Sequence, residues 1–211
     1  MMQEAQKALS KRKSMKFYPH TLAIVFTLFF IFLGVSPIDR SVWIVEVTPV
    51  VIVFLGLVLT YTRFQFSNLS YTLMAFWLFW HTVGAHYTFA NVPFDFITDF
   101  FDFQRNHFDR IGHLSVGFFA YPATEYLLRQ KLANIYVSLL FSLFFIMSIA
   151  CAYEIVEWAY AVIDGGNTGV EFLGTQGDIW DAQKDMLSDT LGAIFALILY
   201  SFIRPDKKTH F

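Results

Sequence analysis

The chain of 211 residues is 56% hydrophobic and 19% aromatic, whereas only 15% of its residues are charged. Soluble domains average about 25% charged residues, so this composition indicates a polytopic membrane protein. A formal net charge of −2 without a basic stripe predicts no nucleic-acid partner, and the single cysteine, Cys151, excludes an intrachain disulfide and a cysteine-rich zinc site.

Apolar runs long enough to cross a bilayer recur along the chain. A basic segment, residues 1–19, precedes the first run at 20–38. That run is long for a signal peptide and no Ala-x-Ala-like site follows it, so we expect an uncleaved span. Two more spans are expected at 43–61 and 69–89. Residues 93–109 alternate aromatic and acidic side chains, which predicts a segment lying in the membrane interface between the third and fourth helices.

The second half of the chain continues this pattern. Runs at 108–128 and 134–163 predict two further spans, and a glycine-rich loop, 164–177, leads into a sixth. The last apolar run, 191–203, is only 13 residues long. A span needs about 20 residues, so the acidic segment 174–189 must supply the missing turns.

The predicted fold is an all-α bundle of six transmembrane helices in one domain, residues 20–203, followed by a short tail, residues 204–211. An even number of spans places both termini on one side of the membrane. With a cytoplasmic N-terminus, eleven Lys and Arg residues lie inside and four outside, so we expect both termini to be cytoplasmic. The inside residues are Lys7, Lys11, Arg12, Lys13, Lys16, Arg63, Arg129, Lys131, Arg204, Lys207 and Lys208; the outside residues are Arg40, Arg105, Arg110 and Lys184.

Four aspartates mark the start of the sixth span. Asp178, Asp181, Asp185 and Asp189 fall within roughly an 80° arc of one helix face. Asp189 lies about 15 Å below the helix start, where a carboxylate needs a protein interior, a cation or water. Asp178 also suits an N-cap and Asp181 the N3 position. Lys184 lies on a different face and is expected to neutralise Asp181 or a lipid phosphate.

The outer halves of the other spans also carry ionisable groups. Asp109 and His113 are one turn apart on one helix, and Glu154 and Glu157 can both point inward from another. Adjacent carboxylates in a low dielectric repel, so they need a cation or a shared proton. A salt bridge with Arg105 or Arg110 and a helix-packing hydrogen bond of His113 are the structural alternatives. Glu46, His81, His86 and His107 lie at similar depth, whereas Glu125 lies near the inner surface and is expected to pair with Arg129.

These residues predict one polar cavity that opens outward and holds a divalent metal ion. Imidazole and carboxylate ligands without thiolates suit Zn, Mn or Fe, and carboxylates alone equally suit Ca or Mg. The candidate ligands are His113, Glu154, Glu157 and Asp185; the candidate proton-transfer groups are Asp189, His81 and His107; the remaining cavity residues are Glu46, His86, Asp109, Gln176, Asp178, Asp181 and Lys184.

Three functions fit such a cavity. The first is a metal-dependent hydrolase or transferase that acts on an amphipathic or lipid-linked cell-envelope substrate, with the metal activating water or polarising a carbonyl or phosphoryl oxygen. The second is a cation- or proton-binding transporter or a small-molecule-binding membrane protein. The third is a scaffold whose buried polar groups only hold helices together. The inner halves of the spans are almost wholly apolar, which disfavours a transport path.

Four motifs carry a family resemblance: HTVGAHYTF (81–89), RNHFDRIGH (105–113), EIVEW (154–158) and GTQGDIWDAQKDM (174–186). In combination they resemble the YjdF-like family of bacterial inner-membrane proteins, a domain of unknown function. This resemblance implies a multi-pass protein of the bacterial inner membrane and supplies no activity. The last helix also resembles the VanZ-like membrane proteins, which implies a role in cell-envelope chemistry.

Overall fold

The computed structural model describes residues 2–164, 166 and 173–208, with side chains described for residues 17–163, 166 and 173–207. Within these residues the chain forms helices and turns and no strand, which confirms the all-α fold class. The basic side chains expected in residues 1–16 and most of the glycine-rich loop lie outside the described part. The elements are α1 (Met2–Gly34), α2 (Arg40–Thr60), α3 (Asn68–Tyr87), η1 (Phe89–Asn91), α4 (Asp95–Phe100), α5 (Phe108–Val116), η2 (Gly117–Phe119), α6 (Ala120–Arg129), α7 (Ile135–Asp164), α9 (Asp181–Ile203) and α10 (Pro205–Lys208).

The turn between α1 and α2 is built from side-chain caps. The Asp39 carboxylate accepts hydrogen bonds from the backbone N–H groups of Ser41 (2.7 Å) and Val42 (2.9 Å), and so caps the first turn of α2. The Arg40 guanidinium donates to the carbonyls of Gly34 (2.7 Å) and Val35 (2.9 Å). These carbonyls end α1 and would otherwise lack partners. The two helices are therefore fixed by a short connection.

The fourth predicted span is continuous but irregular. It consists of α5, the 3₁₀ turn η2 and α6, and it passes closest to α9 at Gly117 and Gly192. A Cβ atom at Gly117 would overlap the backbone of residues 189–193, and one at Gly192 would overlap the carbonyl of Leu114. Glycine at both positions therefore permits backbone-to-backbone packing of the two segments.

The start of α9 differs from the sequence prediction. The N-cap residue is Trp180, and α9 begins at Asp181. Asp178 lies in the preceding turn, where its Oδ1 accepts a hydrogen bond from the Trp180 backbone N–H at 3.1 Å. The prediction of Asp178 as N-cap with Asp181 at N3 is wrong, because ion pairs with basic side chains hold both carboxylates instead.

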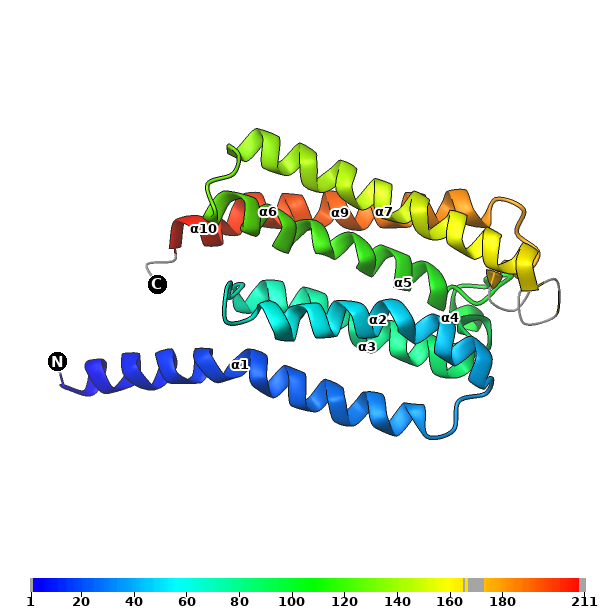
Figure 1. Cartoon of the computed structure of the whole chain (residues 1–211), viewed down its shortest axis with the longest axis horizontal. Coiled ribbons are helices and arrows are strands. Elements are labelled where there is room, and N and C mark those ends of the chain that lie inside the picture. The colour runs from blue at the N-terminus through cyan, green and yellow to red at the C-terminus, as the bar shows by residue number, and fades with distance from the viewer. Residues whose placement is uncertain (1, 165, 167–172, 209–211) are drawn as a thin grey trace.

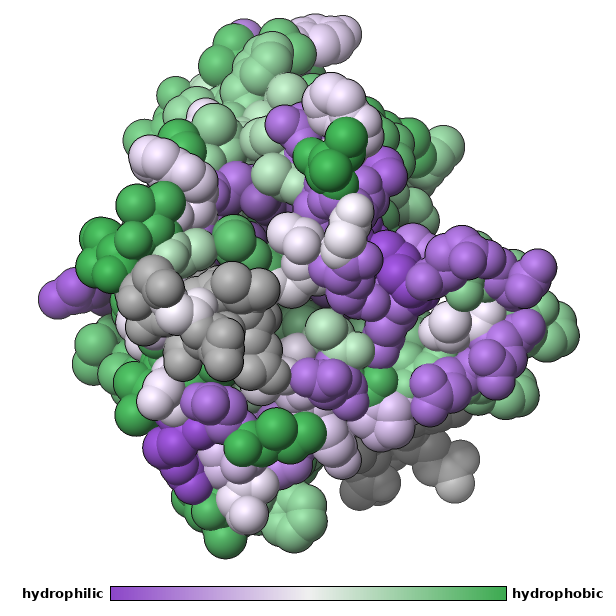
Figure 2. Space-filling view, turned by 90° about the vertical axis from the view of Figure 1, so that its right-hand side faces the viewer, coloured by the Kyte–Doolittle hydropathy of each residue, from purple (hydrophilic) through white to green (hydrophobic). Residues whose placement is uncertain are grey.

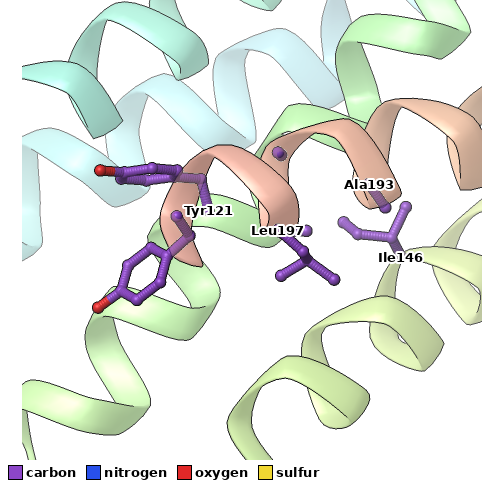
Figure 3. Packing of buried hydrophobic residues seen from close by; sticks show 7 residues of the cluster. Tyr121, Ile146, Ala193 and Leu197 are labelled. Atoms are coloured by element: carbon purple, nitrogen blue, oxygen red, sulfur yellow. The ribbon is translucent and has the colours of Figure 1, made fainter. Parts of the chain in front are cut away.

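The helices form two packed groups (Figure 1). α1, α2 and α3 make one group, whereas α6, α7 and α9 pack with α5 in the other; contacts of α3 with α5 and η2 join them. The second group contains the largest buried hydrophobic cluster, where Tyr121, Ile146, Ala193 and Leu197 meet (Figure 3). The start of α1 and α10 lie at the same end of the bundle (Figure 1).

Within the described part of the chain, four helical segments are long and apolar enough to cross a membrane: 17–34, 40–60, 135–163 and 181–207. Large hydrophobic side chains remain exposed along them, as expected for surfaces that face lipid. α3 and the α5–η2–α6 path run alongside these helices (Figure 1).

The aromatic segment between α3 and α5 lies at the end of the bundle opposite to α10 (Figure 1). It contains the short helix α4, in which Phe96 is 80% exposed and Phe100 72% exposed. Phe101 and Phe103 are also exposed and stack on each other at 5.3 Å between ring centroids. Such a row of exposed rings suits the membrane interface.

Candidate functional site

His113 is the centre of a buried polar cluster where α5, α7 and α9 meet. It is 8% exposed, and its Nδ1 lies 3.0 Å from Oδ2 of Asp189, which is 1% exposed on α9. A carboxylate can only accept a hydrogen bond, so Nδ1 carries the proton. The close approach of α5 and α9 at Gly192 makes this bond possible. In the neutral imidazole, Nε2 then presents a lone pair.

Three carboxylates from three helices surround that Nε2 atom. Asp109 Oδ1 on α5 lies 3.6 Å away, Asp185 Oδ1 on α9 lies 3.8 Å away, and Glu154 Oε1 on α7 lies 4.0 Å away. Asp109, His113 and Asp185 each offer a ligand atom, and these atoms lie within 4.8 Å of one another. Glu154 Oε1 is buried and has no hydrogen-bond partner among the described residues.

This geometry fits a divalent metal ion. Ligand atoms bound tetrahedrally about 2.0–2.2 Å from a metal lie roughly 3.3–3.6 Å apart, slightly less than the 3.6–4.0 Å that separate His113 Nε2 from the three carboxylates here. A carboxylate that fixes the far nitrogen of a ligating histidine is also a recurrent feature of metal sites, and Asp189 stands in that position towards His113. Asp109, His113 and Asp185 would hold the ion, with Glu154 within reach as a fourth ligand.

Basic side chains close the site towards the end of the bundle. The Arg110 guanidinium contacts Asp185 directly, and it also donates to Asp181 Oδ1 at 2.5 Å and to the Asp181 carbonyl at 3.0 Å. Arg105 contacts the same Asp181 carboxylate. Because Arg110 has these other acceptors, Asp185 can turn from it to a metal ion without leaving Arg110 unpaired.

Asp178 and Lys184 form the outermost ion pair of this group. Lys184 Nζ lies 2.6 Å from Asp178 Oδ2, and this hydrogen bond holds the pKa of Asp178 below its usual value. Figure 2 looks onto this end of the molecule, where hydrophilic residues gather between apolar ones. Lys184 is therefore paired with Asp178, whereas Asp181 or a lipid phosphate was the partner expected from the sequence.

A cavity of about 250 Å³ adjoins the His113 cluster. Asp109, His113 and Asp189 line it on one side, and a second polar group lies on the other: His81 Nε2 is 3.0 Å from the Glu46 carbonyl and 3.2 Å from Glu46 Oε2. Most of the remaining lining is apolar. The cavity residues from α2, α3 and η2 are Pro49, Val53, Trp77 and Phe119; those from α7 are Phe145, Ile146, Ile149, Ala150, Tyr153 and Glu157.

Comparison with known proteins identifies the family of the chain. The model of the family described as "Predicted membrane protein (DUF2238)" matches residues 18–206. The chain belongs to this family. It is also 36% identical over 182 residues to "Inner membrane protein YjdF" of Escherichia coli (strain K12), covering 85% of this chain and 87% of that protein. The family resemblance read from the four motifs is thus confirmed. No solved structure matches the chain.

Within this DUF2238 chain, the predicted ligands are largely brought together. His113, Glu154 and Asp185 meet as expected. Glu157 lines the cavity but forms no ion pair with His113 among the described residues. Asp109 lies near His113 Nε2 in the ligand position that was expected for Glu157. Asp189 faces Nδ1, on the side of the ring away from the proposed ligands, so its position suits holding the imidazole.

Other predicted cavity residues lie elsewhere. His86 Nδ1 is 2.8 Å from the Leu33 carbonyl and so ties α3 to the end of α1. Gln176 is exposed and bonds to the backbone of Asn106 at 2.9 and 3.0 Å. His107 precedes α5 and packs its ring against Phe103, with 4.5 Å between centroids. Periodicity places a residue on a helix face, but it does not indicate which neighbour that face meets.

His107 and Glu125 have surroundings that indicate structural roles. Burial, together with the nearby Arg105 cation, lowers the pKa of His107 below its usual value.

Glu125 is fully buried, and it accepts hydrogen bonds from Ser67, Ser70 and Arg129 at 2.5–2.8 Å. The expected Glu125–Arg129 pair is present within α6, and the hydrogen bonds from Ser67 and Ser70 to Glu125 join α6 to the start of α3.

Sequence reasoning missed two residues of the site. Tyr153 donates from its hydroxyl to Glu46 Oε2 at 3.4 Å, and its ring centroid lies 6.2 Å from that of His113, so it lies between the two polar groups. Arg110, considered only as an alternative partner, contacts Asp185. Its position beside Asp109 and the opposite charges of the acidic segment were the signals that could have found it.

Proposed function

We propose that this protein crosses the bacterial inner membrane six times, with both termini in the cytoplasm and the His113 cluster facing the periplasm. α3 and the α5–η2–α6 path, which run alongside the four long apolar helices, would complete the six spans. The distribution of Lys and Arg along the sequence supports this orientation. The relative of known location is an inner-membrane protein by name.

We infer that the His113 cluster binds a divalent metal ion. The observation that carries this proposal is the imidazole of His113, oriented by Asp189 through Nδ1 and facing Asp109, Asp185 and Glu154 through Nε2. Zn, Mn and Fe suit this donor set best, and Ca or Mg suits its carboxylates.

The charge balance of the region supports a bound cation. Its carboxyl groups outnumber its basic groups even if His81 and His113 are both protonated, which leaves three negative charges to neutralise. Uncompensated charges at membrane depth are costly, so protons or a cation must supply the balance. The acidic residues are Glu46, Asp109, Glu154, Glu157, Asp178, Asp181, Asp185 and Asp189; the permanently basic ones are Arg105, Arg110 and Lys184.

We propose that the reaction is a hydrolysis or group transfer on an amphipathic, lipid-like molecule of the cell envelope. A bound metal would polarise a carbonyl or phosphoryl oxygen of such a substrate. His81, which lies 3.2 Å from Glu46 Oε2 and lines the same cavity, would be the proton-transfer group. The apolar lining on α7 suits an alkyl chain. The faint similarity of the last helix to VanZ-like proteins agrees with a substrate from the envelope.

Elemental analysis of protein purified without chelator tests the metal site. We expect one equivalent of a divalent transition metal in the native protein, its loss in Asp185→Asn and in His113→Ala, and its retention in the control Asp206→Asn. Asp206 lies in α10, at the opposite end of α9 from Asp185, and is paired with Arg204 at 2.8 Å. A native protein that binds none of added Zn, Mn, Fe, Ca or Mg tightly would refute the metal site.

The alternative roles predict different results. A cation or proton transporter would need polar groups that continue to the cytoplasmic end. Among the described residues, the apolar cluster of Ala120, Ala193 and Leu197 follows the His113 cluster and interrupts such a path before the Glu125 network. A scaffold would keep its fold and cellular role in Asp185→Asn. Uptake of a cation by reconstituted vesicles, without retained metal, would favour transport over catalysis.

A further inference from the structure

The cavity lies at the joint between the two helix groups, where α2 and α7 face each other without packing. α2 packs against α3, and α7 packs against α6 and α9. Among the described residues, the side-chain hydrogen bond between α2 and α7 runs from the Tyr153 hydroxyl to Glu46 Oε2, and at 3.4 Å it is long. One weak bond therefore spans a seam that is otherwise lined by cavity residues of both helices.

The seam faces sideways, towards the lipid. Phe145 and Ile149 line the cavity and are still 43% and 45% exposed, so the α7 wall of the cavity is also outer surface of the bundle. Leu173, Gly174, Trp77 and Phe119 also line the cavity. The exposed residues beside the seam are apolar, as on the rest of the lipid-facing surface.

We propose that the seam between α2 and α7 is a lateral opening through which the acyl chain of a membrane lipid reaches the cavity. The chain would lie along Pro49 and Val53 on one side and Ile149 on the other, with its polar head between the Glu46–His81 pair and the His113 cluster. This inference deepens the proposed action on a lipid-like substrate and depends on it for its purpose, but it can be tested without any metal or activity.

Two tryptophans provide a matched pair for the test. Trp77 lines the cavity, whereas Trp43 packs in the cluster of α1, α2 and α3 away from it; both are 5% exposed. Single-tryptophan proteins that keep one or the other, with the remaining four replaced by Phe, are reconstituted into vesicles containing chain-brominated phosphatidylglycerol. Trp158, 63% exposed on α7, serves as the lipid-contacting reference.

We expect brominated chains to quench Trp77 far more than Trp43 and nearly as much as Trp158. Equal, weak quenching of Trp77 and Trp43 would overturn the proposal. Where the single-tryptophan protein does not fold, the native chain and its Trp77→Phe variant are compared, and quenching must fall in the variant. Val53→Phe, which fills the cavity, should reduce quenching of Trp77, and Tyr153→Phe, which removes the bond across the seam, should increase it.

The outcomes separate this inference from the metal site. An unquenched Trp77 in a protein that retains its metal would refute the lateral opening alone. A quenched Trp77 in a protein that binds no metal would instead support a lipid-binding cavity and refute the proposed metal chemistry.

Discussion

Gly192 controls how closely α9 approaches α5, so Gly192→Ala should disturb both stability and the His113 cluster. An added Cβ would overlap the carbonyl of Leu114 and lie 3.2 Å from the Cα of Gly117. Restoring an ordinary contact of about 3.5 Å requires the two segments to separate by more than about 1 Å. Overpacking of this kind costs about 1–3 kcal/mol of unfolding free energy.

The same displacement should weaken metal binding. Asp189 lies one helical turn before Gly192, and its hydrogen bond to His113 is 3.0 Å long. A separation of about 1 Å takes this bond past the limit of about 3.5 Å, and loss of such an orienting carboxylate lowers metal affinity about 10–100-fold. Thermal unfolding in detergent and competition titration with a chelator of known affinity measure the two effects.

Gly56→Ala is the matched control, because a Cβ at Gly56 meets no atom within 4 Å. Alanine is favoured over glycine in a helix by up to about 1 kcal/mol, so this variant should be at least as stable as the native protein and keep its metal affinity. If Gly192→Ala unfolds at the same temperature as Gly56→Ala and binds metal equally well, the close approach of α5 and α9 does not organise the site.

Three further outcomes are expected. Asp189→Asn should lower metal affinity about 10–100-fold while His113 stays in place, measured by the same titration. Glu125→Gln should lower the free energy of unfolding by about 1–3 kcal/mol, because the fully buried side chain loses the charge that strengthens its hydrogen bonds from Ser67, Ser70 and Arg129, yet it should not change the metal content of the folded protein. Since the pKa of His107 is lowered by burial and Arg105, the unfolded state binds the extra proton and stability falls as pH drops below about 6.5; His107→Gln should be less sensitive to acid over that range.

The positions of the helices followed closely from the apolar runs. The second predicted span, 43–61, is Arg40–Thr60 in the structure, and the fourth, 108–128, coincides with the α5–η2–α6 path. These helix boundaries can be predicted from the sequence because residues typical of turns and caps, such as Asp39, flank the apolar runs. The start of α9 could not be predicted from the sequence, because ion pairs with basic residues, rather than a local cap, hold Asp178 and Asp181.

The composition of the site was partly readable for a related reason. Residues spaced by three or four positions share a helix face, so Asp109 with His113 could be paired from the sequence alone. The rotation of one helix relative to another could not be predicted from the sequence. For this reason His81 and His86, five residues apart, were both assigned to the cavity, whereas in the structure His81 lines it and His86 contacts the Leu33 carbonyl. Long-range contacts such as Tyr153 to Glu46 depend on that rotation.

The division of the polar residues between the helix groups has a consequence for the proposed reaction. The proposed metal ligands Asp109, His113 and Asp185 belong to α5 and α9, within one packed group, whereas Glu46 and His81 belong to the other. Contacts of α3 with α5 join the two groups beside these ligands, whereas at the α2–α7 seam the groups are linked by the long hydrogen bond from Tyr153 to Glu46. A lipid head that entered through the seam would therefore lie between ligands held within one packed group and the Glu46–His81 pair of the other, and the α3–α5 contacts would set the distance between His81 and those ligands.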